Sequence, residues 1–387
     1  MAPTDSEIAD AISGRYGVVP SRFKWARRTA AFLLRDDISV AVVEGSTPEL
    51  TMDSTRHVVR DISGIEFRVD ALPGDFDATQ DFIGVVEERL IDGAWEEFPL
   101  GLYRLDVGET RYEDDGDRIM TAQAADVGIL LTETGPATPY TVAAATTYKA
   151  AAEAILNTLS LAHALPTDGN STPLTLTWPP FPDTTWFKIL DDLYAGINYR
   201  VPWPGLRGEF TTEEQTDPSA KTSNVTFTDT AEPKMLDAES PYIRRDEPGV
   251  LPNNVVVEIN DPRHTNYGSS QRFNNEAASI ISTANRATIR RKVDAASVPS
   301  TKAILNDTIA IAIATYLLRL AVTDASRATL STFIDPRRDV HEFFTLTVED
   351  AESATLWRSI GWKRPLSFEG VMSHLLGKAQ SISVSAS

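Results

Sequence analysis

The sequence contains no cysteine among its 387 residues. This absence excludes disulfide bonds, thiolate metal sites and a cysteine nucleophile. Histidine is also scarce, and no histidine falls in a His-Glu-x-x-His arrangement or beside a spaced group of ligands. The five histidines are His57, His163, His264, His341 and His374. We therefore expect no metal site.

Nucleotide and hydrolase motifs are missing too. There is no Gly-x-Ser-x-Gly elbow, Walker loop or Gly-x-Gly-x-x-Gly, so we expect no cofactor and no catalytic residue. Paired acids do occur, at Asp191 with Asp192 and at Glu96 with Glu97. A glycosidase needs two carboxylates across one cleft, which proximity in sequence does not supply. We interpret these acids as solvated surface residues and expect no enzyme activity.

Positive charge is in short supply. The chain has 55 Asp and Glu against 36 Lys and Arg, a net charge of -19. This balance disfavours a general nucleic-acid binder, because phosphate neutralisation needs clustered Lys and Arg. DNA can still slide past an acidic wall without sticking. One basic cluster, which we interpret as a solvated or partner-facing segment, comprises Arg22, Lys24, Arg27 and Arg28, interleaved with Phe23 and Trp25.

Neither a secretory signal nor a clear membrane span is evident. The start, Met1 to Glu7, is acidic and lacks the basic and apolar regions of a signal peptide, so we expect no export. The most apolar helix is predicted over residues 300–322, but Asn306, Asp307 and Arg319 interrupt it. We interpret it as a core or subunit-interface helix and expect no stable membrane insertion.

The chain is long enough for two to four domains of about 100 to 200 residues each. Residues 1–139 are dominated by alternating apolar segments between Gly, Pro and Asp turns, which predicts a small antiparallel barrel or sandwich. The predicted strands are 38–43, 65–69, 82–86 and 98–105, followed by a hairpin over 111–122 whose turn is Asp-rich. Punctuation by Gly and Pro at 135–140 marks the first boundary.

Residues 140–227 predict an inserted α+β module. One helix begins after Thr147 and runs to Leu159, and a second follows Pro182 and ends at Gly196. Trp186 lies on the apolar face of the second helix and is expected in the core. A strand is predicted near Trp178, and a hairpin over 197–212.

Residues 228–387 predict a second β domain with the long helix inside it. The predicted strands before the helix are 242–245, 254–260, 278–282 and 287–292. After it, 328–334 and 343–348 are expected to form a hairpin joined at Asp335 and Pro336. Later apolar residues suit short strands, although 369–378 is also compatible with a helix.

The order of these elements resembles the baseplate hub, or minor tail, proteins of long-tailed bacteriophages, particularly those of actinobacterial phages. The matching segments are Phe98-Pro-Leu-Gly101 with its following hairpin, Ala124-Ala-Asp-Val-Gly-Ile-Leu130, the helix from Tyr148, the Trp186 helix with the Pro204-Gly205 hairpin, Pro252-Asn-Asn-Val-Val-Val257, and the helix, strand, Asp335-Pro-Arg-Arg-Asp339 and strand near the end. The resemblance covers nearly the whole chain.

The resemblance implies a structural protein of the virion tail tip, assembled in the host cytoplasm. Such proteins form a trimer around the tail axis, and each subunit contributes two barrel-like domains related to tail-tube folds. Six similar barrels then match the sixfold tail rings to the threefold tip. The implied partners are the distal tail protein, the tape measure protein and other tail-tip proteins, with DNA only in transit through the lumen. We expect the spike or lytic activity that many relatives carry to belong to other proteins of the particle.

We expect part of the negative charge to line the DNA channel, and the basic stretch 286–292 to meet an acidic neighbour. The candidate subunit-interface residues are Ile304, Thr308, Ile311, Thr315, Arg290 and Arg291. Two other classes stay open: a carbohydrate-binding or cell-wall-degrading tip protein, and an unrelated multidomain adhesion protein. Trp178, Trp186, Tyr199 and Trp203 are the aromatic residues that would line a sugar groove, although Trp186 is more simply a core residue and the others are equally suited to subunit contacts.

Overall fold

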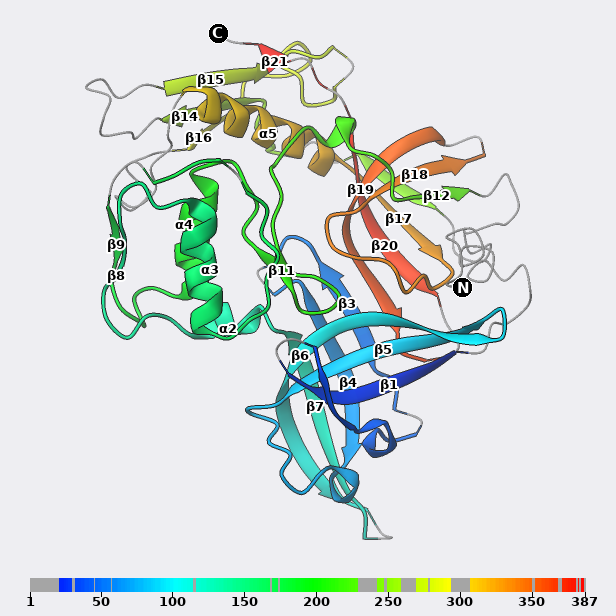
Figure 1. Ribbon diagram of the computed structural model, residues 1–387. Helices are drawn as coiled ribbons and strands as arrows, with labels where there is room; N and C mark the ends of the chain where they lie inside the picture. Colours follow the sequence, from blue (N-terminus) through cyan, green and yellow to red (C-terminus); the bar gives the residue numbers. More distant parts are fainter. Residues whose placement is uncertain are drawn as a thin grey trace.

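We describe the fold from a computed structural model (Figure 1). The structure describes residues 21–29, 32–44, 46–56, 58–113, 116–167, 169–172, 175–228, 242–246, 249–258, 269–277, 279–293, 307–349, 352–367, 371–380, 382 and 384–385. His57, His264, Ile304 and the predicted start of the long helix lie outside these residues.

The first part of the chain forms one side of a large sheet. Its strands are β1 (Ser21–Arg28), β2 (Leu34–Asp37), β3 (Glu49–Asp53), β4 (Arg60–Arg68), β5 (Phe82–Ile91), β6 (Ala94–Tyr112) and β7 (Arg118–Asp126), with 3-10 turns η1 (Ser39–Ala41) and η2 (Val69–Ala71). The tight β5–β6 turn uses Asp92 and Gly93, both with positive φ, as a two-residue hairpin requires. The inward side chains, including Trp25, Phe67 and Ile83, form one apolar core.

The middle of the chain contains both predicted helices, each capped by threonine, and a short helix before them. Its elements are α2 (Ile129–Glu133), β8 (Tyr140–Val142), α3 (Tyr148–Thr158), β9 (Leu176–Trp178), α4 (Trp186–Ala195), β10 (Trp203–Pro204), β11 (Phe210–Thr211) and η3 (Pro218–Ala220). The Thr147 hydroxyl accepts from the Ala150 amide and the Thr185 hydroxyl from the Lys188 amide. The module has its own core, in which Trp186 is buried, as expected.

The last part of the chain holds most of the remaining strands and the long helix. Its elements are β12 (Val225–Thr228), β13 (Ile243–Asp246), β14 (Asn254–Glu258), β15 (Ser269–Asn274), β16 (Arg290–Val293), α5 (Asp307–Ala325), β17 (Ser326–Thr332), β18 (Phe343–Val348), β19 (Glu352–Pro365), β20 (Met372–Lys378) and β21 (Val384–Ser385). Strands β16, β14, β15 and β21 form a separate four-stranded sheet, and α5 packs against it (Figure 1).

One contact joins the first and last parts of the chain into a single sheet. Strand β3 pairs antiparallel with β19, with Met52 opposite Trp362. The result is a 13-stranded sheet in the order β13-β17-β20-β19-β3-β4-β7-β6-β5-β1-β2, with β18 and β12 branching from β19. The fold is therefore β-rich α+β with few helices, which confirms the expectation of β domains around an inserted α+β module only at the level of fold class.

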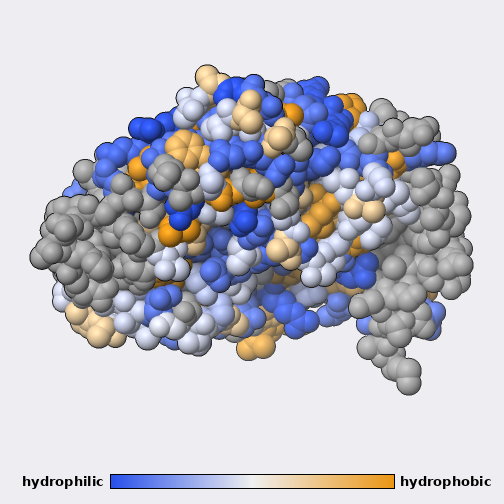
Figure 2. All heavy atoms as spheres, turned by 90° about the horizontal axis from the view of Figure 1, so that it is seen from above, coloured by the Kyte–Doolittle hydropathy of each residue, from blue (hydrophilic) through white to orange (hydrophobic). Residues whose placement is uncertain are grey.

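Helix α5 buries a face rich in small residues. Ala310, Ala314 and Leu318 are fully buried against the four-stranded sheet. The segment Thr308–Ala325 is long and apolar enough to cross a membrane, and 44% of it is buried inside the protein. Figure 2 shows hydrophobic residues scattered among hydrophilic ones on the face above this helix.

Several predicted elements are wrong in the structure. In the described part, β17 and β18 do not form a hairpin, because β17 pairs with β13 and β20 whereas β18 pairs with β19 and β12. Two predicted strands also change type: 38–43 contains the 3-10 turn η1, and 279–282 is a turn. Residues 372–378 form strand β20, which agrees with the expected short strands and not with the alternative helix. The basic cluster at Arg22 is not a separate solvated segment, because it forms strand β1 within the sheet.

Candidate functional site

The loop between β17 and β18, residues 333–342, is where three parts of the chain meet; we call it the junction loop. Arg89 of β5 donates from Nη2 to the Ile334 carbonyl at 2.8 Å. The fully buried Arg60 of β4 pairs with Asp339 and donates to the Pro204 carbonyl of β10 at 2.8 Å. The loop therefore connects the first half of the sheet, the inserted module and the second half.

The junction loop also carries its own buried ionic network. Asp335, which is 1% exposed, pairs with Arg337 at 3.0 Å and Arg338 at 3.1 Å. Burial alone would raise the pKa of Asp335, but the two guanidinium groups lower it below its usual range. Arg338 also donates to Glu342 at 3.3 Å, yet burial raises the pKa of Glu342 to about 7. One carboxyl is thus held charged and its neighbour is pushed towards the neutral form.

The buried carboxylate of Asp126 holds the backbone of Arg60 in place. The Asp126 oxygens accept from the backbone amides of Arg60, at 2.7 Å, and Gly128, at 2.8 Å. Burial raises the pKa of Asp126 to about 6, although Arg60 acts in the opposite direction. The rings of His341 and Trp203 pack edge to face, with their centroids 4.6 Å apart. Burial together with nearby cations lowers the pKa of His341. These contacts fix the position of the loop rather than present groups to a substrate.

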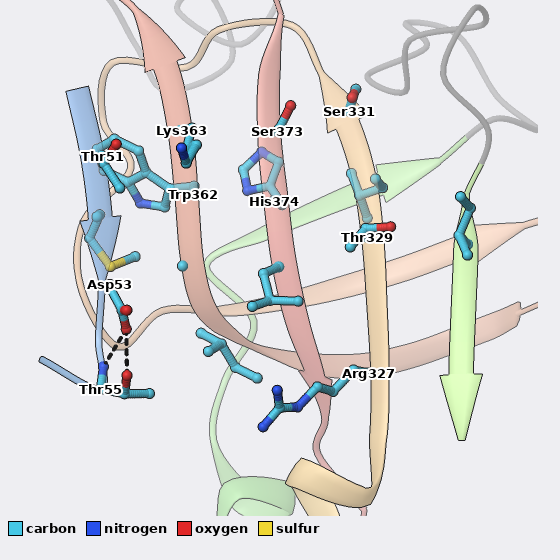
Figure 3. Close-up of a pocket in the computed structure, with 16 residues that line it drawn as sticks. Thr51, Asp53, Thr55, Arg327, Thr329, Ser331, Trp362, Lys363, Ser373 and His374 are labelled. Atoms are coloured by element: carbon cyan, nitrogen blue, oxygen red, sulfur yellow. Dashed lines mark hydrogen bonds between the residues drawn. The ribbon is translucent and has the colours of Figure 1, made fainter. Parts of the chain in front are cut away.

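A shallow depression of about 770 Å³ lies on the sheet face across β3, β19, β20 and β17 (Figure 3). Hydroxyl side chains from several strands point into it. Its labelled polar lining comprises Thr51, Asp53, Thr55, Arg327, Thr329, Ser331, Lys363 and Ser373. The depression therefore crosses the β3–β19 pairing that joins the two halves of the sheet, which we call the seam.

The charged groups around the depression are already engaged. Asp53 accepts from Thr55, Lys363 pairs with Glu49 at 3.3 Å, and Arg327 pairs with Asp324 at 3.6 Å. His374 is 2% exposed and contacts the Thr332 hydroxyl at 2.9 Å, and burial lowers its pKa to about 3. The Thr55 hydroxyl donates to the Asp53 carboxylate at 2.6 Å, a local contact two residues apart within the turn after β3. In the part of the chain that the structure describes, no three His, Asp or Glu residues are grouped to hold a metal.

The aromatic residues of the alternative sugar groove are not gathered on one exposed surface. Tyr199 packs against the core of the inserted module and Trp203 against the core of the first half of the sheet. Trp178 and Trp186 are buried in the core of the module, and the Trp178 indole donates to Asp192 at 3.0 Å. Asp192 is 1% exposed and also pairs with Lys188 at 2.8 Å. The interpretation of Asp192 as a solvated surface acid is therefore wrong, because its carboxylate joins α4 to β9.

The predicted interface residues lie in one part of the molecule. Thr308 is exposed, and Ile311 and Thr315 are half-buried on α5, away from the fully buried Ala310 and Ala314. Arg290 and Arg291 are exposed on β16, which pairs with the β14 strand under α5. The Arg290 Nε also donates to Asn254 at 3.1 Å. The structure thus places the two groups on the same subdomain.

Sequence reasoning missed the residues that hold the junction together, chiefly Arg60, Asp126 and Glu342. The one local signal was the Asp335-Pro-Arg-Arg-Asp339 turn, where charged residues interrupt two apolar strands. That pattern indicates a turn, but it does not indicate that the charges become buried.

The fold is similar to that of three tail proteins, two of them from prophages. A tail protein from Neisseria meningitidis MC58 has a TM-score of 0.59 at 11% identity, covering 92% of this chain and 96% of its own. The 43 kDa tail protein of prophage MuSo2 from Shewanella oneidensis has a TM-score of 0.60 at 9% identity, and the match covers 94% of this chain and 100% of that protein. Prophage tail protein gp18 from Listeria monocytogenes EGD-e has a TM-score of 0.54 at 10% identity, and the match covers 92% of this chain and 94% of that protein.

No known family matches the sequence, and no curated protein does. At such low identities the structural likeness concerns the fold alone. It agrees with the resemblance to phage tail proteins noted above, whereas the narrower actinobacterial assignment has no support from these three structures.

Proposed function

We propose that this chain is a structural protein of a phage tail tip that forms a trimeric hub ring around the DNA channel. The observation that carries the proposal is the end-to-end fold likeness to three tail proteins, each covered over at least 94% of its length. A likeness of this extent includes the inserted module and both halves of the sheet. A shared barrel alone would leave much of either chain unmatched.

Each subunit contributes two barrel-like domains to the ring, one from residues 1–139 and one from residues 228–387, with 140–227 as the inserted module. A second apolar cluster around Phe344, Leu346 and Trp357 supports the division on the side of residues 228–387, whereas the core of the first half also takes in Trp362 and Met372 from the last part of the chain. Three subunits then present six similar units to the sixfold tail tube and distal tail ring, while the threefold symmetry suits the tip. The interface includes the exposed side of α5, with Thr308, Ile311 and Thr315, and the basic strand with Arg290 and Arg291.

The distribution of charge supports a ring through which DNA passes without being held. Residues 1–139 contain 27 Asp and Glu but only 13 Lys and Arg, whereas residues 228–387 contain 19 and 18. The acidic excess therefore belongs to the first barrel-like domain. A lumen lined partly by this domain repels the DNA backbone, which favours transit over binding. The other partners are the distal tail, tape measure and remaining tail-tip proteins of the virion.

The test is the mass and shape of the purified full chain. We expect native mass spectrometry to give three copies, and negative-stain electron microscopy to show a threefold ring with an open centre. Incubation with host cell-wall glycans should give neither binding nor turnover. A chain that stays monomeric and cleaves or binds these glycans would instead identify a carbohydrate-directed tip protein.

A further inference from the structure

The main row of paired strands in the large sheet has an open edge at each end, and its side branch ends in a third edge strand, β12, which among the described residues pairs only with β18. Within the described residues, β2 pairs only with β1 at one end, and β13 pairs only with β17 at the other. Each edge strand is four residues long. An open edge exposes unpaired backbone N–H and C=O groups, and a second strand satisfies them by pairing. The two ends of one sheet therefore offer surfaces of the same kind.

Both edges also expose apolar side chains. Leu34 of β2 is 61% exposed, and Ile243 of β13 is 47% exposed. Leu33 and Val40 beside β2 are exposed by 66% and 75%. Isolated exposed apolar residues are ordinary, but their presence at both free edges favours burial in an assembly.

The charges on the two strands are complementary. Strand β2 reads Leu-Arg-Asp-Asp and β13 reads Ile-Arg-Arg-Asp, so the first carries one excess negative charge and the second one excess positive charge. Asp36 of β2 already pairs with Arg27 of β1 at 3.3 Å, and its side chain is 42% exposed. Arg245 has no ion pair with any described residue, whereas Arg244 already pairs with Glu352 at 3.0 Å. The uncompensated charge of β13 is therefore at Arg245.

One antiparallel register matches every charge. It sets Arg35 opposite Asp246, Asp36 opposite Arg245, and Asp37 opposite Arg244. Shifting this register by one residue in one direction sets Arg35 against Arg245, and in the other Asp36 against Asp246. The best parallel register pairs two charges and sets Arg35 against Ile243. Opposite charges facing each other across strands stabilise a pairing and like charges oppose it, so a single arrangement is favoured.

We propose that β2 of one copy of this chain pairs antiparallel with β13 of the next copy, in the register that sets Asp36 opposite Arg245. The contact is head-to-tail, so repeating it closes a ring when the rotation between copies allows. This inference rests on the proposed ring and names the surface that closes it. It also pairs both ends of the main row of strands after assembly, and leaves the β12 branch as it is.

The absence of cysteine makes a direct test possible. Asp36→Cys combined with Arg245→Cys in the full chain places two thiols on directly opposite residues, within reach of a disulfide. Mild oxidation should convert most of the protein to covalent oligomers on a non-reducing gel, and reduction should restore the single chain. The matched control combines Arg35→Cys with Arg245→Cys. Its thiols point to opposite faces of the sheet, and we expect little cross-linking.

A charge exchange gives an independent readout. Arg245→Glu sets two acids opposite each other and should raise the concentration for half-assembly by more than about tenfold. Adding Asp36→Arg should restore assembly. A trimer that forms without the cross-link, or that ignores the exchange, overturns the edge pairing and leaves the ring intact. A cross-link in a species other than a trimer supports the pairing and overturns the threefold ring, and a monomer without a cross-link overturns both.

Discussion

Arg60 is the residue that ties the most distant parts of the chain together. It is fully buried, and its partner Asp339 is 279 residues away in the sequence. Removing one member of a buried ion pair leaves the other uncompensated, which costs about 3 to 5 kcal/mol. We expect Arg60→Met to lower the free energy of unfolding by about that amount, as measured by urea denaturation.

A nearby exposed arginine supplies the matched control. Arg56 pairs with Asp61, and its side chain is 51% exposed. Exposed ion pairs contribute less than about 1 kcal/mol, so Arg56→Met should change stability little. Equal losses in the two variants would contradict the role of Arg60 at the junction.

Glu342 makes stability depend on pH. Its pKa lies at about 7 in the folded chain because it is buried, against 4.5 for the unfolded value. Between these values the folded protein keeps a proton that the unfolded chain has lost, so stability falls as the pH rises through this window. The shift corresponds to about 3 kcal/mol. Glu342→Gln keeps an acceptor for Arg338 and does not ionise.

Comparing the unfolding free energies of Glu342→Gln and the natural chain separates the effect of Glu342 from that of other titrating groups. Asp126, with a pKa of about 6, acts in the same direction, whereas His374, with a pKa of about 3, destabilises the fold as the pH falls. Both stay in the variant, so their effects cancel in the difference. We expect Glu342→Gln to gain up to about 3 kcal/mol over the natural chain between pH 5 and pH 8. A difference that does not change with pH would show that Glu342 does not carry a raised pKa.

Helices with local capping signals were predicted well from the sequence, whereas the pairing partners of strands were not. Thr147 and Thr185 cap helices because their hydroxyls satisfy amides three residues on. The first helix was predicted from such a cap, and the second from Pro182, its apolar face and Gly196. The pairing of β17 was predicted wrongly. A Pro and several charges after Thr332 resemble a hairpin turn, but the loop there runs to the distant β4 and β5 strands. Sequence spacing does not report such distant contacts.

Helix α5 shows the same limit at its surface. Its composition predicted a helix, but a broad apolar face does not say which stripe enters the core. The structure buries Ala310 and Ala314, and leaves Ile311 half-buried. We expect Ile311→Asp to abolish the trimer while the monomer keeps its far-ultraviolet circular dichroism, because the charge falls on the proposed interface.

Ala314→Asp is the matched variant on the same helix. Ala314 is fully buried against the four-stranded sheet, so an unpaired carboxylate there should prevent folding rather than only assembly. Sedimentation and circular dichroism distinguish the two outcomes. A trimer that is unchanged in Ile311→Asp would place this side of α5 on the outside of the ring.

For the whole molecule, the order of weak motifs carried more information than any single motif. The order resembled phage tail proteins, and the fold likeness to three tail proteins agrees with it. The continuity of the sheet could not be predicted in the same way, because β3 and β19 are separated by about 300 residues and neither strand carries a signal for the other. Their pairing depends on the folded positions of everything between them.

Because the seam between β3 and β19 joins the two halves of the sheet, we expect the halves to fold together. The core of the first half includes Val340, Trp362, Leu366 and Met372, which come from the last part of the chain. A fragment of residues 1–139 lacks these side chains and the β19 strand that pairs with β3. We expect this fragment to be unfolded or insoluble alone, because its core is incomplete and the edge of β3 is open. Co-expression with residues 140–387 should restore a soluble complex with native circular dichroism. A fragment that folds alone with a cooperative thermal transition would show that the first barrel-like domain is independent, and that the seam joins two finished units.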